Sequence, residues 1–183
     1  MTPGMGVTID EWRGQGPRLD AELDMLAEVL HAVVHDGASV SFVVPFSHDD
    51  ARRFWSDKVL PDVINASRRV LVARSAGKIV GTVQLEMAGQ PNQQHRAEVA
   101  KLLVHPDARR RGIARALMHA LEDIARAERR TLLTLDTRTG DNAEPLYASI
   151  GYIRVGVIPR FARGPHSPKL DGTTIFYKEL VEK

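Results

Sequence analysis

Four arginines and a glycine lie close together near the middle of the chain, in a pattern that could hold a phosphate group. Residues 102–115 read LLVHPDARRRGIAR: an apolar run, a loop with three arginines, and a glycine before an amphipathic stretch. The first N–H groups of a helix lack backbone partners and carry the positive end of its dipole, which favours an anion. Gly112 has no Cβ to keep a phosphate from the backbone, and Arg109, Arg110 and Arg111 add positive charge. This pattern predicts a pyrophosphate site.

The same arginines have two other interpretations. They could be a solvated surface before a helix, because short motifs often occur by chance, and neither G-x-x-x-x-G-K-S/T nor G-x-G-x-x-G is present. They could also contact a nucleic acid. The chain carries 25 basic and 23 acidic residues, a formal net charge of +2. So small an excess, with no recognised binding module around it, argues against a nucleic-acid partner.

The elements that must position this loop follow from the hydrophobic periodicity. Helical spacing predicts helices over residues 19–34, 112–127 and 143–150. A capping-type serine, Ser47, begins another that runs to about residue 63 and is bent or ended by Pro61. We expect seven strands, over residues 7–12, 70–74, 78–87, 97–104, 131–137, 152–158 and 173–180. In the fourth strand, one face is predicted to carry Glu98, Ala100, Leu102 and Val104.

Turn signals separate these elements. Residues 75–77 (SAG) predict a hairpin, and residues 159–172 are expected to form a long loop. The order is β-α-α-β-β-β-α-β-α-β-β, which is typical of a single α/β domain. We expect a mixed central sheet of about seven strands with about four flanking helices, spanning residues 6–181.

Composition limits the class of protein. The 183 residues are 43% hydrophobic and 26% charged, enough to bury the core of one globular domain. No apolar run reaches the roughly 18 residues of a membrane span, and the first residues do not resemble a signal peptide. With no cysteine, the chain has neither disulfides nor thiolate chemistry. We therefore expect a cytoplasmic enzyme or binding protein.

A second motif identifies a family. Residues 146–152 (LYASIGY) fit LY-x-x-x-GY, and residues 109–114 fit R-x-x-G-x-A after LLV-x-P. Together, in this order and spacing, these motifs resemble the GNAT superfamily of N-acetyltransferases. Further stretches are similar to the tabtoxin-resistance acetyltransferases, which acetylate a small amine-bearing β-lactam toxin: VHDGASVSF from residue 34, QPNQQHRAEVAKLLV from 90, LDTRTG from 135 and TTIFYKEL from 173.

The resemblance implies acetyl-CoA as co-substrate, no metal, and a small-molecule amine acceptor such as an antibiotic or toxin. It implies no nucleic-acid partner and no membrane partner. It also implies that the protein is a monomer or a homodimer. Pantetheine would lie along the strand ending at residue 104, and pyrophosphate would rest on the N–H groups after it. The cofactor-binding residues implied are Leu102, Leu103, Val104, Arg109, Arg110, Arg111, Gly112, Ile113, Ala114 and Arg115.

Three side chains are candidates for the chemistry. A lysine-like amine with a pKa of about 10.4 is neutral in roughly one molecule in 2,500 at pH 7, so a general base matters. Glu98 and Asp136, on neighbouring core strands, are the candidates, unless they only pair with arginines such as Arg96. The resemblance makes Tyr147 the general acid, the alternative being a core tyrosine, and a backbone N–H near Leu103 the oxyanion donor.

Two histidines are candidates either for a metal site or for a position near the acceptor. His31 and His35 have the i,i+4 spacing of a metal pair, but no third ligand is evident, so no metal is expected. His35 and Asp36 lie in the subgroup-like stretch and are expected near the acceptor. Residues 161–172 and 35–46 are long enough to close a small pocket. The competing functions are peptide or protein N-acetylation, at an N-terminus or a lysine, and a non-catalytic acyl-CoA-binding module.

Overall fold

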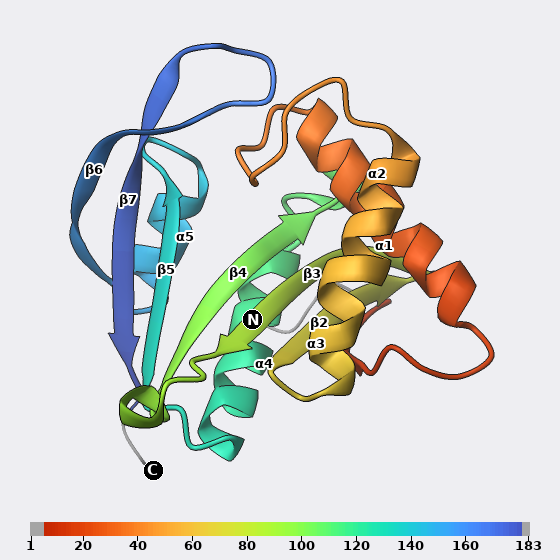
Figure 1. Ribbon diagram of the computed structural model, residues 1–183, viewed down its shortest axis with the longest axis horizontal. Coiled ribbons are helices and arrows are strands. Elements are labelled where there is room, and N and C mark those ends of the chain that lie inside the picture. Colours follow the sequence, from red (N-terminus) through yellow and green to blue (C-terminus); the bar gives the residue numbers. More distant parts are fainter. Residues whose placement is uncertain (1–5, 181–183) are drawn as a thin grey trace.

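A mixed sheet of seven strands forms the centre of the protein (Figure 1). A computed structural model describes residues 6–180, so the last residue of the predicted 6–181 domain lies outside the described part. The sheet order is β1-β2-β3-β4-β5-β7-β6, and only the β4–β5 pair is parallel. The strands are β1 (Val7–Trp12), β2 (Arg68–Ser75), β3 (Lys78–Met87), β4 (Arg96–Val104), β5 (Leu132–Arg138), β6 (Ile153–Arg163) and β7 (Leu170–Glu179).

Four helical units flank this sheet, which confirms the predicted fold class. They are α1 (Leu19–His35), a continuous run of α2 (His48–Arg53), the π-helical η1 (Phe54–Val59) and α3 (Leu60–Ile64), then α4 (Ile113–Ala127) and α5 (Ala143–Ser149). One buried cluster joins α4 to the sheet and includes residues of α5, and a second joins α1 and the α2–α3 run to its other face (Figure 1). The sheet therefore has two apolar layers.

The second helical unit begins as predicted but does not end at its proline. Ser47 accepts a hydrogen bond from the Asp50 N–H, and Asp50 bonds back to the Ser47 N–H, a capping box. The helix passes through Pro61 to Ile64. Proline clashes with the carbonyl four residues earlier in a regular α-helix. The wider π turn immediately before it, in which the Leu60 N–H bonds the Trp55 carbonyl, accommodates the ring.

An extra residue interrupts β4 at Lys101, whose φ of 49° is left-handed. The register with β3 shifts between Thr82 and Gln84, which marks a β-bulge. The expectation of one shared face is therefore wrong, because the bulge divides Glu98, Ala100, Leu102 and Val104. Beyond it, Leu102 and Val104 pack on the α4 side of the sheet. Before it, Ala97 and Val99 take that side, so Glu98 faces the other way.

The strands β4 and β5 pair only where they begin. Arg96, Ala97 and Glu98 lie opposite residues 132–134, and the two strands then diverge (Figure 1). After Glu98, the backbone groups of β4 that face β5 therefore have no strand partner in the described part of the chain. Such groups are available to an extended ligand.

The last hairpin is longer than predicted. The expected strand over residues 152–158 continues to Arg163 as β6, and β7 begins at Leu170, so only residues 164–169 connect them. The prediction of a loop over residues 159–172 is wrong because Pro159 lies on an edge strand, where a missing N–H is tolerated. A register shift between Ile158 and Ala162 accommodates it.

Candidate active site

The predicted anion site is the turn that leads into α4. Arg110 and Gly112 have φ values of 62° and 77°, and Gly112 is the N-cap of α4 with no side-chain cap bond. The first N–H groups of α4 therefore point out of the helix end without an N-cap side chain. A Cβ built on Gly112 meets nothing within 4 Å, so the space in front of this turn is open. The turn has the donors and the room that a phosphate needs.

The arginines around this turn divide into two pairs. Arg109 donates to Asp36 at 2.5 Å and, through Nε, to the Val104 carbonyl at 3.3 Å. Arg115 donates to Ser149 at 2.8 Å. Arg110 and Arg111 are exposed. Positive charge that can move toward an anion is thus supplied by Arg110 and Arg111, whereas Arg109 links the turn to α1.

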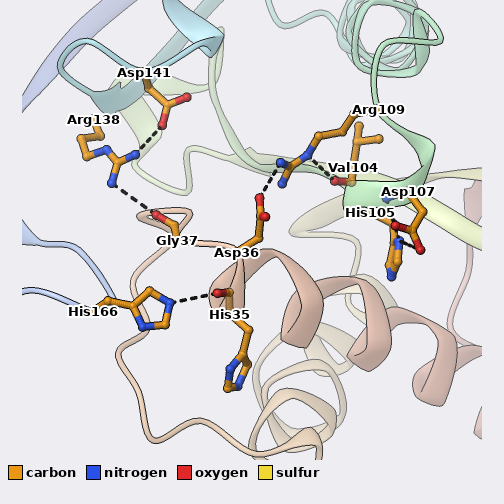
Figure 2. Close-up of polar contacts among 10 residues, drawn as sticks. All are labelled: His35, Asp36, Gly37, Val104, His105, Asp107, Arg109, Arg138, Asp141 and His166. Carbon is orange, nitrogen blue, oxygen red and sulfur yellow. Dashed lines mark hydrogen bonds and ion pairs between the residues drawn. The ribbon is translucent and has the colours of Figure 1, made fainter.

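The C-terminal end of α1 is connected to three distant segments (Figure 2). Besides the Asp36–Arg109 pair, His166 Nε2 donates to the His35 carbonyl at 2.9 Å. Arg138, at the end of β5, donates to the Gly37 carbonyl at 3.3 Å and pairs with Asp141. Nearby, the Val44 N–H donates to the Pro165 carbonyl at 3.2 Å. The β6–β7 connection therefore lies against residues 35–46.

His35 and Asp36, predicted to lie near the acceptor, both have their side chains bonded within the protein. His35 Nε2 lies 2.8 Å from the Phe46 carbonyl, and its ring centroid is 4.2 Å from that of His31. Asp36 is occupied by Arg109. In the structure, these two side chains connect the end of α1 to Phe46 and to Arg109. Their contact with the acceptor stays a prediction.

Glu98 lies among carboxylates on the sheet face opposite α4. It is directly across from Glu86 on β3 and pairs with Thr134, two residues before Asp136, on β5. Partial burial, followed by the negative charges of Glu86 and Asp136, raises the pKa of Glu98. Asp136 differs, because its Oδ2 accepts a hydrogen bond from Thr173 Oγ1 at 2.7 Å. A raised pKa is the property that a general base at neutral pH needs.

Tyr147 lies on the α4 side of the sheet, opposite the face that carries Glu98. It lies on α5, is buried, and packs against Tyr152 and Phe176 with ring centroids 5.9 and 5.8 Å away. Burial, reinforced by Asp141 and Asp136, raises the pKa of its hydroxyl, so Tyr147 holds its proton at neutral pH. Asp136 thus acts on both Glu98 and Tyr147. The base and acid candidates flank the place where β4 and β5 diverge.

One residue of this face was not predicted. Lys101, at the bulge, donates to Ser41 Oγ at 3.2 Å and lies over the rings of Phe42 and Phe54. A charged residue within the apolar run VAKLLV was the available signal. Its orientation depends on the bulge, which the alternation of apolar residues did not predict.

Residues 6–180 contain neither a group of side chains arranged as metal ligands nor a helix suited to span a membrane. The His31–His35 pair gains no third ligand there, and no group of three or more His, Cys, Asp or Glu residues is arranged to hold a metal. None of the helices in this range has the length and apolar character needed to cross a bilayer.

Comparison with known proteins places this geometry in a family. A model of the acetyltransferase (GNAT) family matches residues 32–152. The chain is 32% identical over 127 residues to an N-acetyltransferase from the hisH-hisA intergenic region of Azospirillum brasilense, covering 68% of this chain and 73% of that one. It is 37% identical over 92 residues to the N-alpha-acetyltransferase RimI of Mycobacterium tuberculosis, covering 50% and 56%.

Solved structures share the fold. One is yncA of Salmonella typhimurium, solved with its cofactor acetyl-CoA. It superposes with a TM-score of 0.75 at 18% identity, covering 97% of this chain and 95% of that one. At this identity the likeness concerns the fold alone.

Proposed function

We propose that this chain, which belongs to the acetyltransferase (GNAT) family, acetylates the primary amine of a small molecule. That it is an N-acetyltransferase follows from the family, and the acceptor is the proposed part. The observation that carries the proposal is the position of residues 164–169 against residues 35–46. The Val44–Pro165 and His166–His35 bonds join the two segments. An extended peptide crossing this side would have to displace them, whereas a small amine would not.

The proposed cofactor site uses the two features that suit acetyl-CoA. Within the described residues, the edge of β4 at Leu102, Leu103 and Val104 has no strand partner on the side of β5 and offers sheet-like bonds to pantetheine, although the Val104 carbonyl already accepts a bond from Arg109. The N–H groups of residues 110–114, with the open space at Gly112, fit a pyrophosphate, and Arg110, Arg111 and Arg115 lie around them. Bound acetyl-CoA supplies the acetyl thioester. Arg109 contributes by positioning, because its guanidinium already bonds Asp36 and Val104.

In this proposal, Glu98 is the base and Tyr147 the acid. Among residues 6–180, the Glu98 carboxylate has no hydrogen-bond partner, and its raised pKa favours accepting a proton from the acceptor ammonium, directly or through water. Asp136, which accepts a hydrogen bond from Thr173, raises the pKa of both groups through its charge. Tyr147 gives its proton to the departing sulfur. The N–H near Leu103 stabilises the developing oxyanion by roughly 3–4 kcal/mol.

The finer identity of the acceptor rests on sequence resemblance. The stretches from residues 34, 90, 135 and 173 resemble tabtoxin-resistance acetyltransferases, so an amine-bearing β-lactam or another antibiotic is our first candidate. Antibiotic resistance and a cytoplasmic location are parts of the same proposal.

A protein N-terminus is the second candidate. The name of the RimI relative, an N-alpha-acetyltransferase, favours it. An α-amino group with a pKa of about 8 costs only about 1.4 kcal/mol to deprotonate at pH 7, so such an acceptor would depend less on Glu98.

Release of free CoA from acetyl-CoA across a panel of amines distinguishes these acceptors. The panel contains amino-acid-like β-lactams, aminoglycosides, polyamines and short peptides, each at several concentrations. We expect the highest kcat/KM with a small amine. Faster turnover of peptides than of every small amine would overturn the proposal in favour of peptide acetylation.

A further inference from the structure

Lys101 presents a cation on the sheet face that carries Glu98, opposite α4. The bulge gives this residue a φ of 49° and places its side chain on the side of α1 and the α2–α3 run. Its Nζ lies 5.9 Å from the ring centroids of both Phe42 and Phe54, and Ser41 Oγ is its hydrogen-bond partner at 3.2 Å. Two aromatic faces and one hydroxyl thus surround the ammonium group.

No carboxylate lies within 4.0 Å of this ammonium anywhere in residues 6–180. Lys178 differs, because its Nζ bonds both oxygens of Glu122, at 2.7 and 2.8 Å, and the Ile150 carbonyl. Burial lowers the pKa of Lys101, although Glu86, Asp136 and Glu98 oppose this shift from a longer range. A partly buried cation without an ion-pair partner is unfavourable, and an anion that reaches it is bound more strongly than at an exposed lysine.

The charges on this face are separated in the way that a zwitterion requires. Glu98 and Asp136 form the negative part, which attracts an ammonium group, and Glu86 lies beside them but is paired with Arg68 at 3.1 Å. Lys101 forms the positive part, and the rings of Phe42 and Phe54 beside it offer apolar contact. An acceptor with an amine at one end, an anion at the other and a short apolar body between them matches all three features.

We propose that Lys101 binds a carboxylate of the acceptor, so that the substrate is an amino-acid-like molecule whose amine lies toward Glu98. This proposal rests on the proposed function and narrows its substrate class. Another compact oxyanion attached to an amine, such as a phosphinate, has the same chemistry toward Lys101. Lys101 is a binding residue here and takes no part in proton transfer.

Matched acceptors provide the test. For the wild type, kcat/KM is measured with amino acids and with the corresponding amino-acid amides, which retain the amine but lack the negative charge. A hydrogen bond to a charged group contributes about 1.5–3 kcal/mol, so we expect the wild type to prefer the acid by about 10- to 100-fold. Lys101→Met keeps the length of the side chain and removes the charge. In this variant the preference should fall to about one, mainly through KM for the acid.

Ser41→Ala is the matched control. It removes the hydrogen bond that Lys101 makes to the 38–46 segment but leaves the ammonium group, so the preference for the acid should persist. If Ser41→Ala abolished the preference as fully as Lys101→Met, Lys101 would only position the segment, and the proposal would be wrong. Lys101→Met should melt no lower than the wild type at pH 7, because the lowered pKa of Lys101 means that its charged form opposes folding.

The results separate this inference from the proposed function. Equal kcat/KM for acids and amides in the wild type, or an unchanged preference in Lys101→Met, would overturn the inference and leave the small-amine proposal intact. Failure of the wild type to acetylate any small amine, with peptides accepted, would overturn both.

Discussion

Replacing Tyr147 by Phe removes one hydroxyl from a buried ring and should separate catalysis from stability. The Phe ring retains the contacts with Tyr152 and Phe176. Within residues 6–180 the Tyr147 hydroxyl has no protein hydrogen bond to lose, and burial and carboxylate charges account for its raised pKa. A hydroxyl with a structural hydrogen bond would contribute about 1 kcal/mol, or about 2–4 °C in Tm for a chain of this size. We expect a smaller loss of stability than that.

Turnover should respond strongly to the same substitution. Loss of a general acid typically costs 10²–10⁴ in rate, which is about 2.7–5.5 kcal/mol of transition-state stabilisation. Because the hydroxyl acts as the sulfur departs, kcat should fall while KM for acetyl-CoA changes little. A residue that served only packing would leave kcat unchanged, because the Phe ring keeps the contacts with Tyr152 and Phe176.

The assay is single-turnover acetyl transfer, so that product release does not hide the chemical step, together with thermal denaturation. Tyr152→Phe is the matched control, because the Tyr152 hydroxyl is buried without a hydrogen-bond partner among residues 6–180. Tyr152 lies beside Lys178, with the ring centroid 5.5 Å from Nζ. We expect Tyr152→Phe to keep the wild-type rate. A near wild-type rate in Tyr147→Phe, or equal losses in both variants, would refute the role assigned to Tyr147.

Three further predictions concern the base, the turn before α4 and the α1 connection. Glu98→Gln should lower kcat/KM by about 10²–10⁴, and the loss should be smaller at high pH, where the amine is already neutral. A loss of the same size at every pH of a pH–rate profile would mean that Glu98 positions the amine and is not the base. Burial, followed by the charges of Glu86 and Asp136, raises the pKa of Glu98 against the opposing effect of Arg96 and Lys101, so ionised Glu98 opposes folding. Glu98→Gln should therefore melt no lower than the wild type at pH 7, and this difference should disappear below pH 4.5, where Glu98 is protonated in both the folded and the unfolded state. Gly112→Ala should lower the free energy of unfolding by about 1–2 kcal/mol, because φ is 77° at this position. It should also weaken CoA binding in a calorimetric titration, and an unchanged affinity would argue against the phosphate site. Asp36→Asn breaks a half-exposed ion pair and should lower the free energy of unfolding by less than about 1 kcal/mol. A large rise in KM for the acceptor would support the predicted contact of Asp36 with the acceptor, whereas a KM within twofold of the wild type would argue against that contact.

Local sequence patterns predicted the elements whose conformation depends mainly on residues that are adjacent in the sequence. The strand Val7–Trp12 has the predicted bounds. The hairpin at residues 75–77 forms because Ala76 and Gly77 both adopt positive φ, at 48° and 77°. The turn before α4 was predictable for the same reason, since a glycine preceding an amphipathic stretch marks a helix start.

Features that depend on distant partners were not predictable in this way. The bulge at Lys101 arises where β4 pairs with β3, and no alternation of apolar residues reveals it. Pro159 ends a strand in most contexts, but its place on the edge strand β6 could be known only from the sheet order. The pairing of Arg109 with Asp36 joins residues 73 positions apart, so the sequence could predict an arginine near the phosphate site but not its partner.

The structure also decides which substitution at Gly112 tests the phosphate site. A valine would place a branched side chain where a phosphate is expected to rest. With φ at 77°, a β-branched residue is strained there whatever the space in front of it. Alanine is therefore the better probe of the turn.

Stoichiometric transfer of the acetyl group from acetyl-CoA to an amine is the defining property of the proposed enzyme. The wild-type protein is incubated with acetyl-CoA and a small amino-acid-like amine, and free CoA and acetylated amine are quantified in the same samples by thiol titration and mass spectrometry. We expect equal amounts of the two products, both dependent on the amine and both greatly reduced in Glu98→Gln and Tyr147→Phe. Release of CoA without acetylated amine, or binding of acetyl-CoA with neither product, would contradict the proposed acetyl transfer.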